Sequence, residues 1–371
     1  MKRSLWAKLC VIGLLVSLLS GCQFKDIDKR SFVLAIGVDR PEDPETKHLY
    51  EVTLKTALPE GDPTARTQES IMITQVAPSI PEAVRLMKSK IDKELDFSHC
   101  KVVVYGQALA KENIAAVLDW TTRRRDLQLI MYCAVGVPNA KEVIQMQPKT
   151  ERVPGNALIL SLSKDGSESP FVHTVYSFDL ARKMTEHGID PIMPVVHTQD
   201  PDMLVVNKLA VFNKSKMVGT LTPDETRLFN LLATKNLITS FRVMAEGNAY
   251  DYYLESSKSE YKINPAKAGK ATVSYKVSGS GTIEMNDEGI PVTGPVLREV
   301  SRAANEQWEK DVKALCQKFQ GLGVDPLGWG LRYFSRNWNN EQEVQQWKEL
   351  YPELEFQVKA DVKMKYTGLI R

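Results

Sequence analysis

The chain has 371 residues, of which 43% are apolar and 25% are charged, so it is long enough for two or three domains with cores of their own. Its formal charge of +2 depends on the first 21 residues, which hold three of the 48 basic residues and no acidic one. The rest of the chain has 45 basic against 46 acidic residues, a balance that argues against nucleic-acid binding.

The start of the chain has the pattern of a lipoprotein signal peptide. A basic segment is followed by an apolar run over residues 9–19, and the run ends in Leu19-Ser20-Gly21-Cys22. A run of this length is typical of a secretory signal and is short for a membrane-spanning helix. A thiol directly after a small pair can take a diacylglycerol thioether. We therefore expect a signal peptide over residues 1–21 and lipidation of Cys22, the alternative being an ordinary signal peptide with a chance cysteine.

The other cysteines give no further signal. Cys10 lies in the leader, and Cys100, Cys133 and Cys316 fit neither a zinc-binding spacing nor a disulfide framework. Cys133 lies in an apolar run and is expected to be a small buried hydrophobic residue. A Cys100–Cys133 bridge remains open at this point.

Strands are predicted in the first half by apolar patterns. They cover residues 31–38, 49–57, 69–75, 101–105 and 131–137. The first is almost continuously apolar, which is typical of a central strand. In the second, Glu51, Thr53 and Lys55 alternate with apolar residues, which predicts that these three side chains face water.

Helices are predicted in the same half by apolar residues at spacings of three and four. They cover residues 79–91, 112–120, 140–146 and 174–187. The inward residues expected in the last helix are Val175, Phe178, Leu180, Ala181 and Met184, with Gly188 after its end. Arg123-Arg124-Arg125 follows the second helix. It is either a contact for lipid phosphates or a solvated helix end whose cations complement the helix dipole, and we favour the second reading.

Three prolines mark residues 190–202 as the passage between two halves of the chain. Beyond it, residues 203–212 and 217–221 predict a hairpin, and Thr222-Pro223-Asp224-Glu225 has the capping box and early proline of a helix start. Further strands are predicted over residues 238–243, 250–254, 260–263, 272–277 and 281–285. Short strands joined by turns indicate an antiparallel or mixed sheet.

The longest predicted helix spans residues 296–319. Its apolar stripe consists of Leu297, Val300, Ala304, Trp308, Val312, Leu315 and Phe319. A last alternating strand covers residues 356–366. We therefore expect a multi-domain α+β protein with mixed or antiparallel sheets, in which the long helix covers the C-terminal sheet. The expected domains are 22–200 and 201–371.

No catalytic or cofactor motif is found in the sequence. His48, His99, His173, His187 and His197 lack the spacings of a metal site, and neither a nucleophile elbow nor a phosphate-binding loop occurs. The fragment Gly279-Ser280-Gly281 has no helix-opening third glycine and predicts a bulge or turn. We expect no enzyme activity, no cofactor and no metal ion.

Short motifs in a fixed order connect the chain with a known family. They are Gly21-Cys22, Asp26 to Val33 and Ala35-Ile36-Gly37-Val38-Asp39 at the front, Leu209 to Phe212, Met217 to Leu221 and Glu225 in the middle, and Asp325-Pro326-Leu327-Gly328-Trp329-Gly330, Trp347, Tyr351 to Leu354 and Thr367-Gly368 in the tail. Together they resemble the Ger(x)C family of spore germination lipoproteins, the C subunits of nutrient-germinant receptors. Members often carry Trp-Asp after the lipidated cysteine, where this chain has Gln23-Phe24.

The resemblance implies a non-enzymatic protein anchored to the inner membrane of the spore. Its implied partners are a multi-span A subunit, a transporter-like B subunit and, through Cys22, membrane lipid; its implied role is receptor assembly and germinant response. Cys22 is the one functional position that the resemblance transfers. A solute-binding lipoprotein is the competing reading and would require two doubly wound lobes around a cleft. A hydrolase would require a pocket with a perturbed carboxylate or a metal site.

Overall fold

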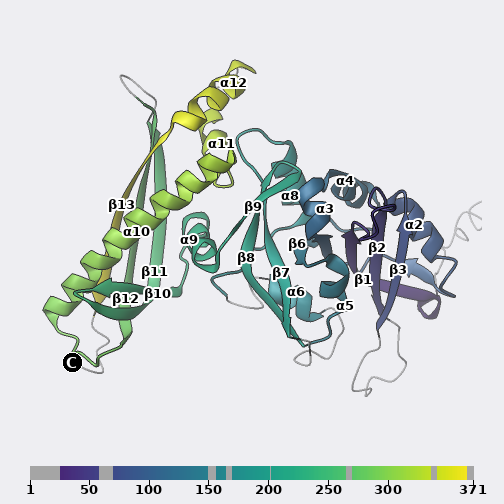
Figure 1. Ribbon diagram of the computed structural model, residues 1–371, viewed down its shortest axis with the longest axis horizontal. Helices are drawn as coiled ribbons and strands as arrows, with labels where there is room; N and C mark the ends of the chain where they lie inside the picture. The colour runs from purple at the N-terminus through teal and green to yellow at the C-terminus, as the bar shows by residue number, and fades with distance from the viewer. Residues whose placement is uncertain are drawn as a thin grey trace, which may run out of the picture.

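Two β-sheets with helices packed on them form the body of the protein (Figure 1). The computed structural model describes residues 26–57, 70–148, 156–163, 169–200, 202–264, 270–335 and 341–365. This α+β architecture with several layers agrees with the expected fold class.

The first sheet combines a parallel centre with antiparallel hairpins on both sides. Its strands are β1 (Arg30–Asp39), β2 (Tyr50–Ala57), β3 (Ser70–Ala77), β4 (Glu94–Asp96), β5 (Val102–Gly106), β6 (Tyr132–Val137), β7 (Ile192–Asp200), β8 (Met203–Asn213) and β9 (Lys216–Leu221). They follow the order β3-β2-β1-β5-β6-β7-β8-β9, with β4 paired to the start of β1. Strands β1, β5, β6 and β7 are parallel. The apolar β1 therefore lies inside the sheet, as predicted.

Helices cover both faces of this sheet. One face carries α2 (Ile80–Met87), α3 (Gln107–Glu112), α4 (Ala115–Arg123) and α8 (Ser177–Thr185), and the other carries α5 (Ala140–Gln145) and α6 (Asn156–Leu162). Figure 1 shows the two groups above and below the strands. Each face has its own apolar core. The short helices α3 and α6 were not predicted from the sequence.

The prediction that β2 has one face in water is wrong. Thr53 and Lys55 are 0% and 2% exposed, because α5 packs across β1 and β2 on that side. The alternation of apolar and polar residues was real, but a helix about 90 residues further along the chain covers the polar side.

Two further predictions need correction near α8 and β7. Phe178 was expected to face inward but is 48% exposed, since the helix begins only at Ser177 and the residues before it run extended beside β6. Residues 190–202, expected to connect two halves, include the nine-residue strand β7. The first sheet thus continues past residue 200 to Leu221.

The second sheet is mixed, as predicted. It contains β10 (Thr239–Ala245), β11 (Asn248–Asn264), β12 (Thr272–Asn286) and β13 (Glu355–Lys365), with the first three antiparallel and β13 parallel to β12. The four short strands predicted over residues 250–285 are two long ones. Gly279-Ser280-Gly281 lies within β12, opposite a register shift of β11 between Leu254 and Ser256.

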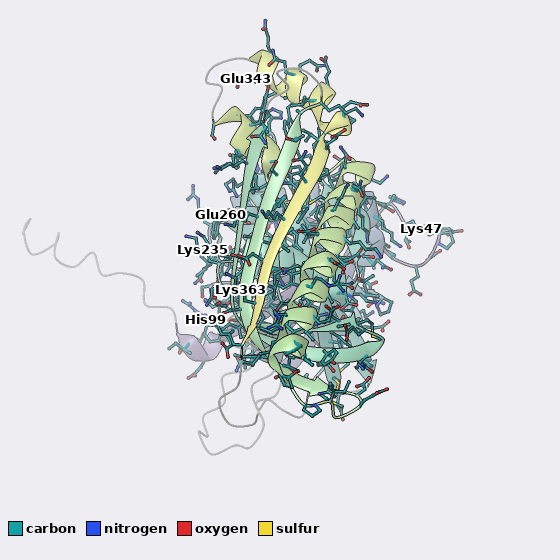
Figure 2. All side chains as sticks on the ribbon, turned by 90° about the vertical axis from the view of Figure 1, so that its left-hand side faces the viewer. Lys47, His99, Lys235, Glu260, Glu343 and Lys363 are labelled. Atoms are coloured by element: carbon teal, nitrogen blue, oxygen red, sulfur yellow. The ribbon has the colours of Figure 1, made fainter. Side chains whose placement is uncertain are left out.

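One long helix, α10 (Gly294–Leu322), covers this sheet on one face (Figures 1 and 2). Every residue of its predicted stripe is buried, and it ends at Gly323 in the left-handed conformation. The shorter α11 (Trp329–Phe334) and α12 (Glu341–Leu350), which follow it, were not predicted.

Polar side chains of α10 also cap the free edge of β13. Ser301 Oγ, Asn305 Oδ1 and Glu309 Oε1 accept hydrogen bonds from the backbone N–H groups of Met364, Val362 and Ala360 at 2.9, 2.6 and 3.0 Å. Four helical residues rise about 6 Å and two strand residues about 6.6 Å, so the two series stay in step. An edge strand that would otherwise offer unpaired amides is thereby satisfied.

Helix α9 (Pro223–Ala233) joins the two sheets, as Figure 1 shows. Its predicted capping box is present between Thr222 and Glu225. Lys318 of α10 forms an ion pair of 2.6 Å with Glu225. Apolar residues of β7 to β9, α9, α10 and the second sheet form one continuous core. A single apolar core therefore extends across both halves.

Candidate functional site

The predicted lipidation site, Cys22, lies outside the described residues. The described chain begins at Asp26 and forms a short 3₁₀ turn, η1 (Ile27–Lys29), before β1. Asp26 caps this turn by accepting a hydrogen bond from the N–H of Asp28. Within the described ranges, none of the helices combines the length and apolar character that crossing a membrane requires.

The three cysteines of the described chain are core residues. Cys100, Cys133 and Cys316 are buried and free, so the possible Cys100–Cys133 bridge is not formed. Burial raises the pKa of Cys100 and of Cys133 to about 12, which keeps both thiols protonated and unreactive. Among the described residues no group of three His, Cys, Asp or Glu side chains is arranged to hold a metal ion.

Asp39, the last residue of β1, is a buried carboxylate that fixes a helix start. Its Oδ1 and Oδ2 accept hydrogen bonds from the N–H groups of Ala140 and Lys141, at 2.7 and 2.9 Å, in the first turn of α5. Burial raises the pKa of Asp39 to about 6, against the opposing effect of these two amides. A Cβ on Gly106 would lie 1.7 Å from Asp39 Oδ1, so only glycine leaves room there.

The other end of α5 is held by a buried cation. Lys55 Nζ donates hydrogen bonds to the carbonyl oxygens of Ile144 and Met146, both at 3.0 Å. Burial lowers the pKa of Lys55 to about 8. A carboxylate at the N-terminus and an ammonium at the C-terminus both complement the helix dipole. The six-residue α5 is therefore fixed by one charged group of the sheet at each end.

Asp325 forms a second buried polar cluster where the two halves meet. Its Oδ2 accepts a hydrogen bond from the N–H of Gly330 at 2.7 Å, and its backbone exchanges two more with Asp190, at 2.8 and 2.9 Å. Lys214 Nζ lies 3.3 Å from Asp190 Oδ1. Burial raises the pKa of Asp325 to about 7, and neighbouring Asp190 adds to the effect.

Two glycines let the chain segments of this junction approach closely. Gly188, which has a φ of +77°, packs against Gly330, where a Cβ on either glycine would come within 2.6 Å of the other's backbone. Leu331 N–H donates to Gly188 O at 2.8 Å. Trp329, fully buried, donates from Nε1 to the hydroxyl of Tyr275 at 2.6 Å. The tail motif from Asp325 to Gly330 thus joins the two halves.

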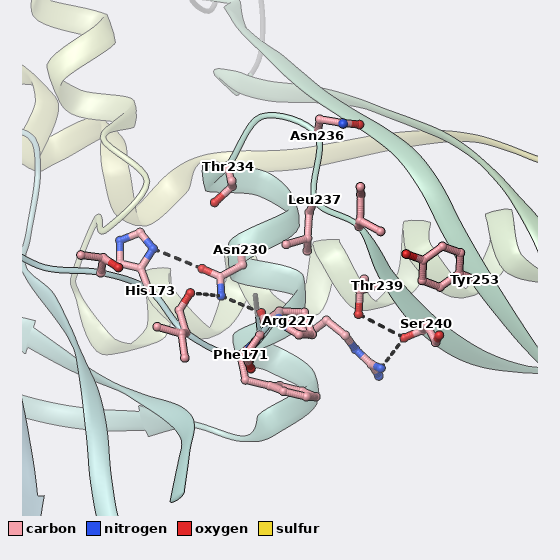
Figure 3. Close-up of a pocket in the computed structure, with 15 residues that line it drawn as sticks. Phe171, His173, Arg227, Asn230, Thr234, Asn236, Leu237, Thr239, Ser240 and Tyr253 are labelled. Carbon is pink, nitrogen blue, oxygen red and sulfur yellow. Dashed lines mark hydrogen bonds between the residues drawn. The ribbon is translucent and has the colours of Figure 1, made fainter. Parts of the chain in front are cut away.

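A cavity of about 860 Å³ lies at a separate place, beside α9 (Figure 3). Its walls are residues 169–174, the second half of α9, the segment leading into β10, and Tyr253 of β11. These parts come from both halves of the chain, which places the cavity between the sheets. We call it the junction cavity.

The polar groups of the junction cavity bond to one another. Asn230 Nδ2 donates to the carbonyl oxygens of Pro170 and Val172, at 2.8 and 3.3 Å. This orients its Oδ1 toward His173 Nδ1, at 3.1 Å, so His173 carries a proton on Nδ1. Arg227 donates to Ser240 O at 2.5 Å (Figure 3). Its guanidinium also lies over the ring of Phe241, at 4.5 Å from the centroid.

The size of the cavity lies within the range of small-molecule sites. Its polar side chains, however, hold residues 169–174 and β10 against α9. Neither Asp39 nor Asp325, the two carboxylates with strongly raised pKa values, lines it. The arrangement can accommodate a small ligand or a partner side chain, and it offers no carboxylate for acid–base chemistry.

Sequence reasoning did not find the roles of these residues. Asp39 and Asp325 stood in the motifs quoted for the family resemblance, and that was the only signal for them. Asp39 bonds to Ala140, 101 residues away, and the backbone of Asp325 bonds to Asp190, 135 residues away, which is beyond the reach of any local pattern. Only Gly330, the partner of the Asp325 carboxylate, lies close by in the sequence. The junction cavity is lined by residues 169–174, by residues between 227 and 240, and by Tyr253. These segments are far apart in the sequence, so no local pattern predicts the cavity.

The fold and these buried polar groups define a two-sheet α+β protein. Its two carboxylates with raised pKa values, Asp39 and Asp325, accept hydrogen bonds from its own backbone. Residues 23–198 match the family model "Spore germination protein N-terminal domain", and residues 207–368 match "Spore germination B3/ GerAC like, C-terminal". The chain belongs to the Ger(x)C family of spore germination proteins.

Relatives of similar length support this assignment. Spore germination protein KC of Bacillus subtilis is 24% identical and spore germination protein B3 of the same organism 23%; the matches cover 99% and 98% of this chain and 97% and 98% of the relatives. The putative spore germination protein YfkR of Bacillus subtilis is 22% identical over all of this chain. The crystal structure of the GerBC protein has the same fold, with a TM-score of 0.54 at 18% identity over 90% of this chain and 98% of that one.

Proposed function

We propose that this chain is a lipid-anchored subunit of a nutrient-germinant receptor, held at the outer face of the inner spore membrane through Cys22. The observation that carries the proposal is the pairing of two germination-family matches with a signal pattern ending in Leu19-Ser20-Gly21-Cys22. The family supports the role in germination, and the signal pattern supports export, cleavage after residue 21 and attachment to lipid.

The proposed partners are the integral-membrane A and B subunits of the receptor. Two acyl chains on Cys22 are enough for stable attachment to a bilayer. Attachment confines the chain to the membrane plane, which raises its effective concentration against other membrane proteins. A modest contact surface can then hold a complex together, and the chain's role is receptor assembly and response.

The subunit acts without turnover of its own on this proposal. The carboxylates with strongly raised pKa values, Asp39 and Asp325, are bonded to backbone amides and are both 4% exposed. The solute-binding alternative has little support, because it needs two doubly wound lobes. The C-terminal half is instead a four-stranded sheet under one long helix.

A division of the mature chain near residue 200 is part of the proposal. The two family models support it, since one match ends at residue 198 and the next begins at residue 207. Strands β8 and β9 follow that point and still complete the first sheet, so the two units share β-structure at their boundary.

Spores that carry a Cys22→Ala chain test the proposal, with Gln23→Ala as the matched control. We expect Cys22→Ala to abolish palmitate labelling, to lower the amounts of the A and B subunits in the inner membrane and to impair the response to the receptor's nutrient. Gln23→Ala should behave as the parent, and responses through unrelated receptors should be unchanged. Normal A and B levels with a normal response in spores lacking the chain would contradict the proposal, provided that paralogues are deleted as well.

A further inference from the structure

Four large apolar side chains are exposed at one end of the first sheet. Ile27 of η1 is 58% exposed, Leu129 and Ile130, in the turn before β6, are 46% and 55% exposed, and Phe178 at the start of α8 is 48% exposed. The parallel strands β1, β5 and β6 all begin at this end. We call these four residues the apolar end of the sheet.

Contacts connect the segments that carry these side chains. Phe178 N–H donates to Leu129 O at 3.0 Å. Gln128 Nε2 donates to Ser98 O at 3.0 Å, and neighbouring His99 packs edge-on against Phe32 of β1 at 4.7 Å between ring centroids. Figure 2 shows the N-terminal turn beside the labelled His99, on the side of the molecule opposite to Lys47.

Aromatic and cationic groups accompany the apolar end. The Phe178 ring stacks on Tyr176 at 5.7 Å, and Tyr176 packs on Tyr132 at 5.2 Å. Tyrosine suits a membrane–water boundary, since its ring is apolar and its hydroxyl is polar. Arg125 is exposed a few residues before Leu129 and has no ion-pair partner among the described residues, so it can meet a lipid phosphate.

The short segment between Cys22 and Ile27, here called the tether, limits how far the apolar end can lie from the membrane. Ile27 lies five positions after Cys22, and an extended chain advances at most about 3.6 Å per position, or about 18 Å in all. With lipid on Cys22, Ile27 cannot lie further than this from the headgroup region. The turn at the other end of β1, around Lys47, is charged and includes Glu42, Asp43 and Glu45.

We propose that the apolar end of the first sheet rests on the lipid surface, with Leu129, Ile130 and Phe178 in the headgroup boundary and the turn around Lys47 pointing away from the membrane. The inference depends on the proposed lipidation of Cys22. It goes beyond that anchor because it fixes the orientation of the whole protein. A partner protein is the less favoured occupant, since the short tether brings this end to the bilayer itself.

Photo-crosslinking in the full-length chain tests the orientation. A benzoylphenylalanine replaces Ile130 or Phe178 in two variants and Lys47 in a third, the matched control; all three side chains are exposed, so the fold is retained. Membranes from cells that express each variant are irradiated, and crosslinked phospholipid is quantified. Palmitate incorporation is measured on the same samples, which tests the anchor separately.

We expect lipid crosslinks at positions 130 and 178 and a yield several-fold lower at position 47. A palmitate-labelled chain with equal yields at all three positions, or a higher yield at 47, would overturn the orientation while leaving the anchor intact. Crosslinks from 130 and 178 to a protein instead of lipid would also overturn it. A chain without palmitate and without lipid crosslinks would remove both the anchor and the orientation.

Discussion

The helices α5 and α10 are fixed on their sheets in two different ways. Helix α5 has six residues, and charged side chains of the first sheet, Asp39 and Lys55, bind its two ends. Helix α10 has 29 residues and lies on the second sheet through an apolar stripe that spans its whole length. A short helix buries too little apolar surface to fix its position, so polar contacts to its ends decide it. A long helix buries a much larger apolar surface, so burial can contribute most to fixing it.

Removing the central residue of the α10 stripe should have the largest effect. Trp308 is 1% exposed and packs at 5.3 Å against Phe241, so Trp308→Ala is expected to lower the free energy of unfolding by about 3–5 kcal/mol. The control is Lys310→Ala on the exposed side of the same helix, which should change little. Chemical denaturation followed by circular dichroism measures both. An unchanged midpoint for Trp308→Ala would mean that burial does not hold α10.

Removing the carboxylate that fixes α5 should have the next largest effect. Asp39→Ala leaves the N–H groups of Ala140 and Lys141 without their acceptors, which should cost about 2–3 kcal/mol of unfolding free energy. Glu42→Ala, at an exposed position just after β1, is the control. Hydrogen exchange should speed up most at the start of α5. Equal protection of these amides in the variant and the parent would contradict the role assigned to Asp39.

The buried carboxylate at the junction should make stability depend on pH. The folded pKa of Asp325, about 7, lies above its ordinary value of 3.8, so the folded chain binds more protons than the unfolded one between these pH values. Stability should therefore fall as pH rises from about 4 to 7, and then level off.

The variant Asp325→Asn isolates this contribution. Unfolding curves at several pH values should show a smaller decline for Asp325→Asn than for the parent. Asp39, with a folded pKa of about 6, adds a decline of the same sign up to about pH 6, and it persists in the variant. Asp92→Asn, an exposed position, should leave the parent's profile unchanged. Identical profiles for the parent and Asp325→Asn would show that folding does not raise the pKa of Asp325.

The smallest expected effect concerns the edge of the second sheet. Asn305→Ala removes the acceptor of the Val362 N–H and should cost about 1 kcal/mol of unfolding free energy. It should also increase concentration-dependent association, because part of the β13 edge becomes available for pairing. Sedimentation of Asn305→Ala beside Lys313→Ala, an exposed control on α10, measures this. If both variants remain equally monomeric, the polar caps do not protect the edge.

The two ends of the first sheet differ in a way that bears on function. Ligands of open α/β sheets bind beyond the carboxyl ends of parallel strands. Above β1 and β6 that end is covered by α5, because Asp39 accepts hydrogen bonds from the first amides of α5 and a Cβ on Gly37 or Gly136 would clash with α5 or the loop before it. The opposite end exposes Ile27, Leu129, Ile130 and Phe178. Such a distribution suits a protein that acts through its surfaces, in line with the proposed assembly role.

The sequence alone determined the features that depend on near neighbours. The α10 stripe, the capping box at Thr222 and the alternation of β13 were predicted correctly, because helix and strand periods and caps involve residues only a few positions apart. The order of short motifs along the chain indicated the family, and the two family matches confirm it. The signal pattern ending at Cys22 is also local, and it stays a prediction.

Only the tertiary structure decided the features that join distant residues. Lys55 has the pattern of a solvated strand residue, yet α5 buries it; Phe178 has the pattern of a core residue, yet it is exposed. Asp39 and Ala140, Asp190 and Asp325, and Gly188 and Gly330 meet across more than 100 residues. Which face of an element is covered depends on what the rest of the chain packs against it, and no local period encodes that choice.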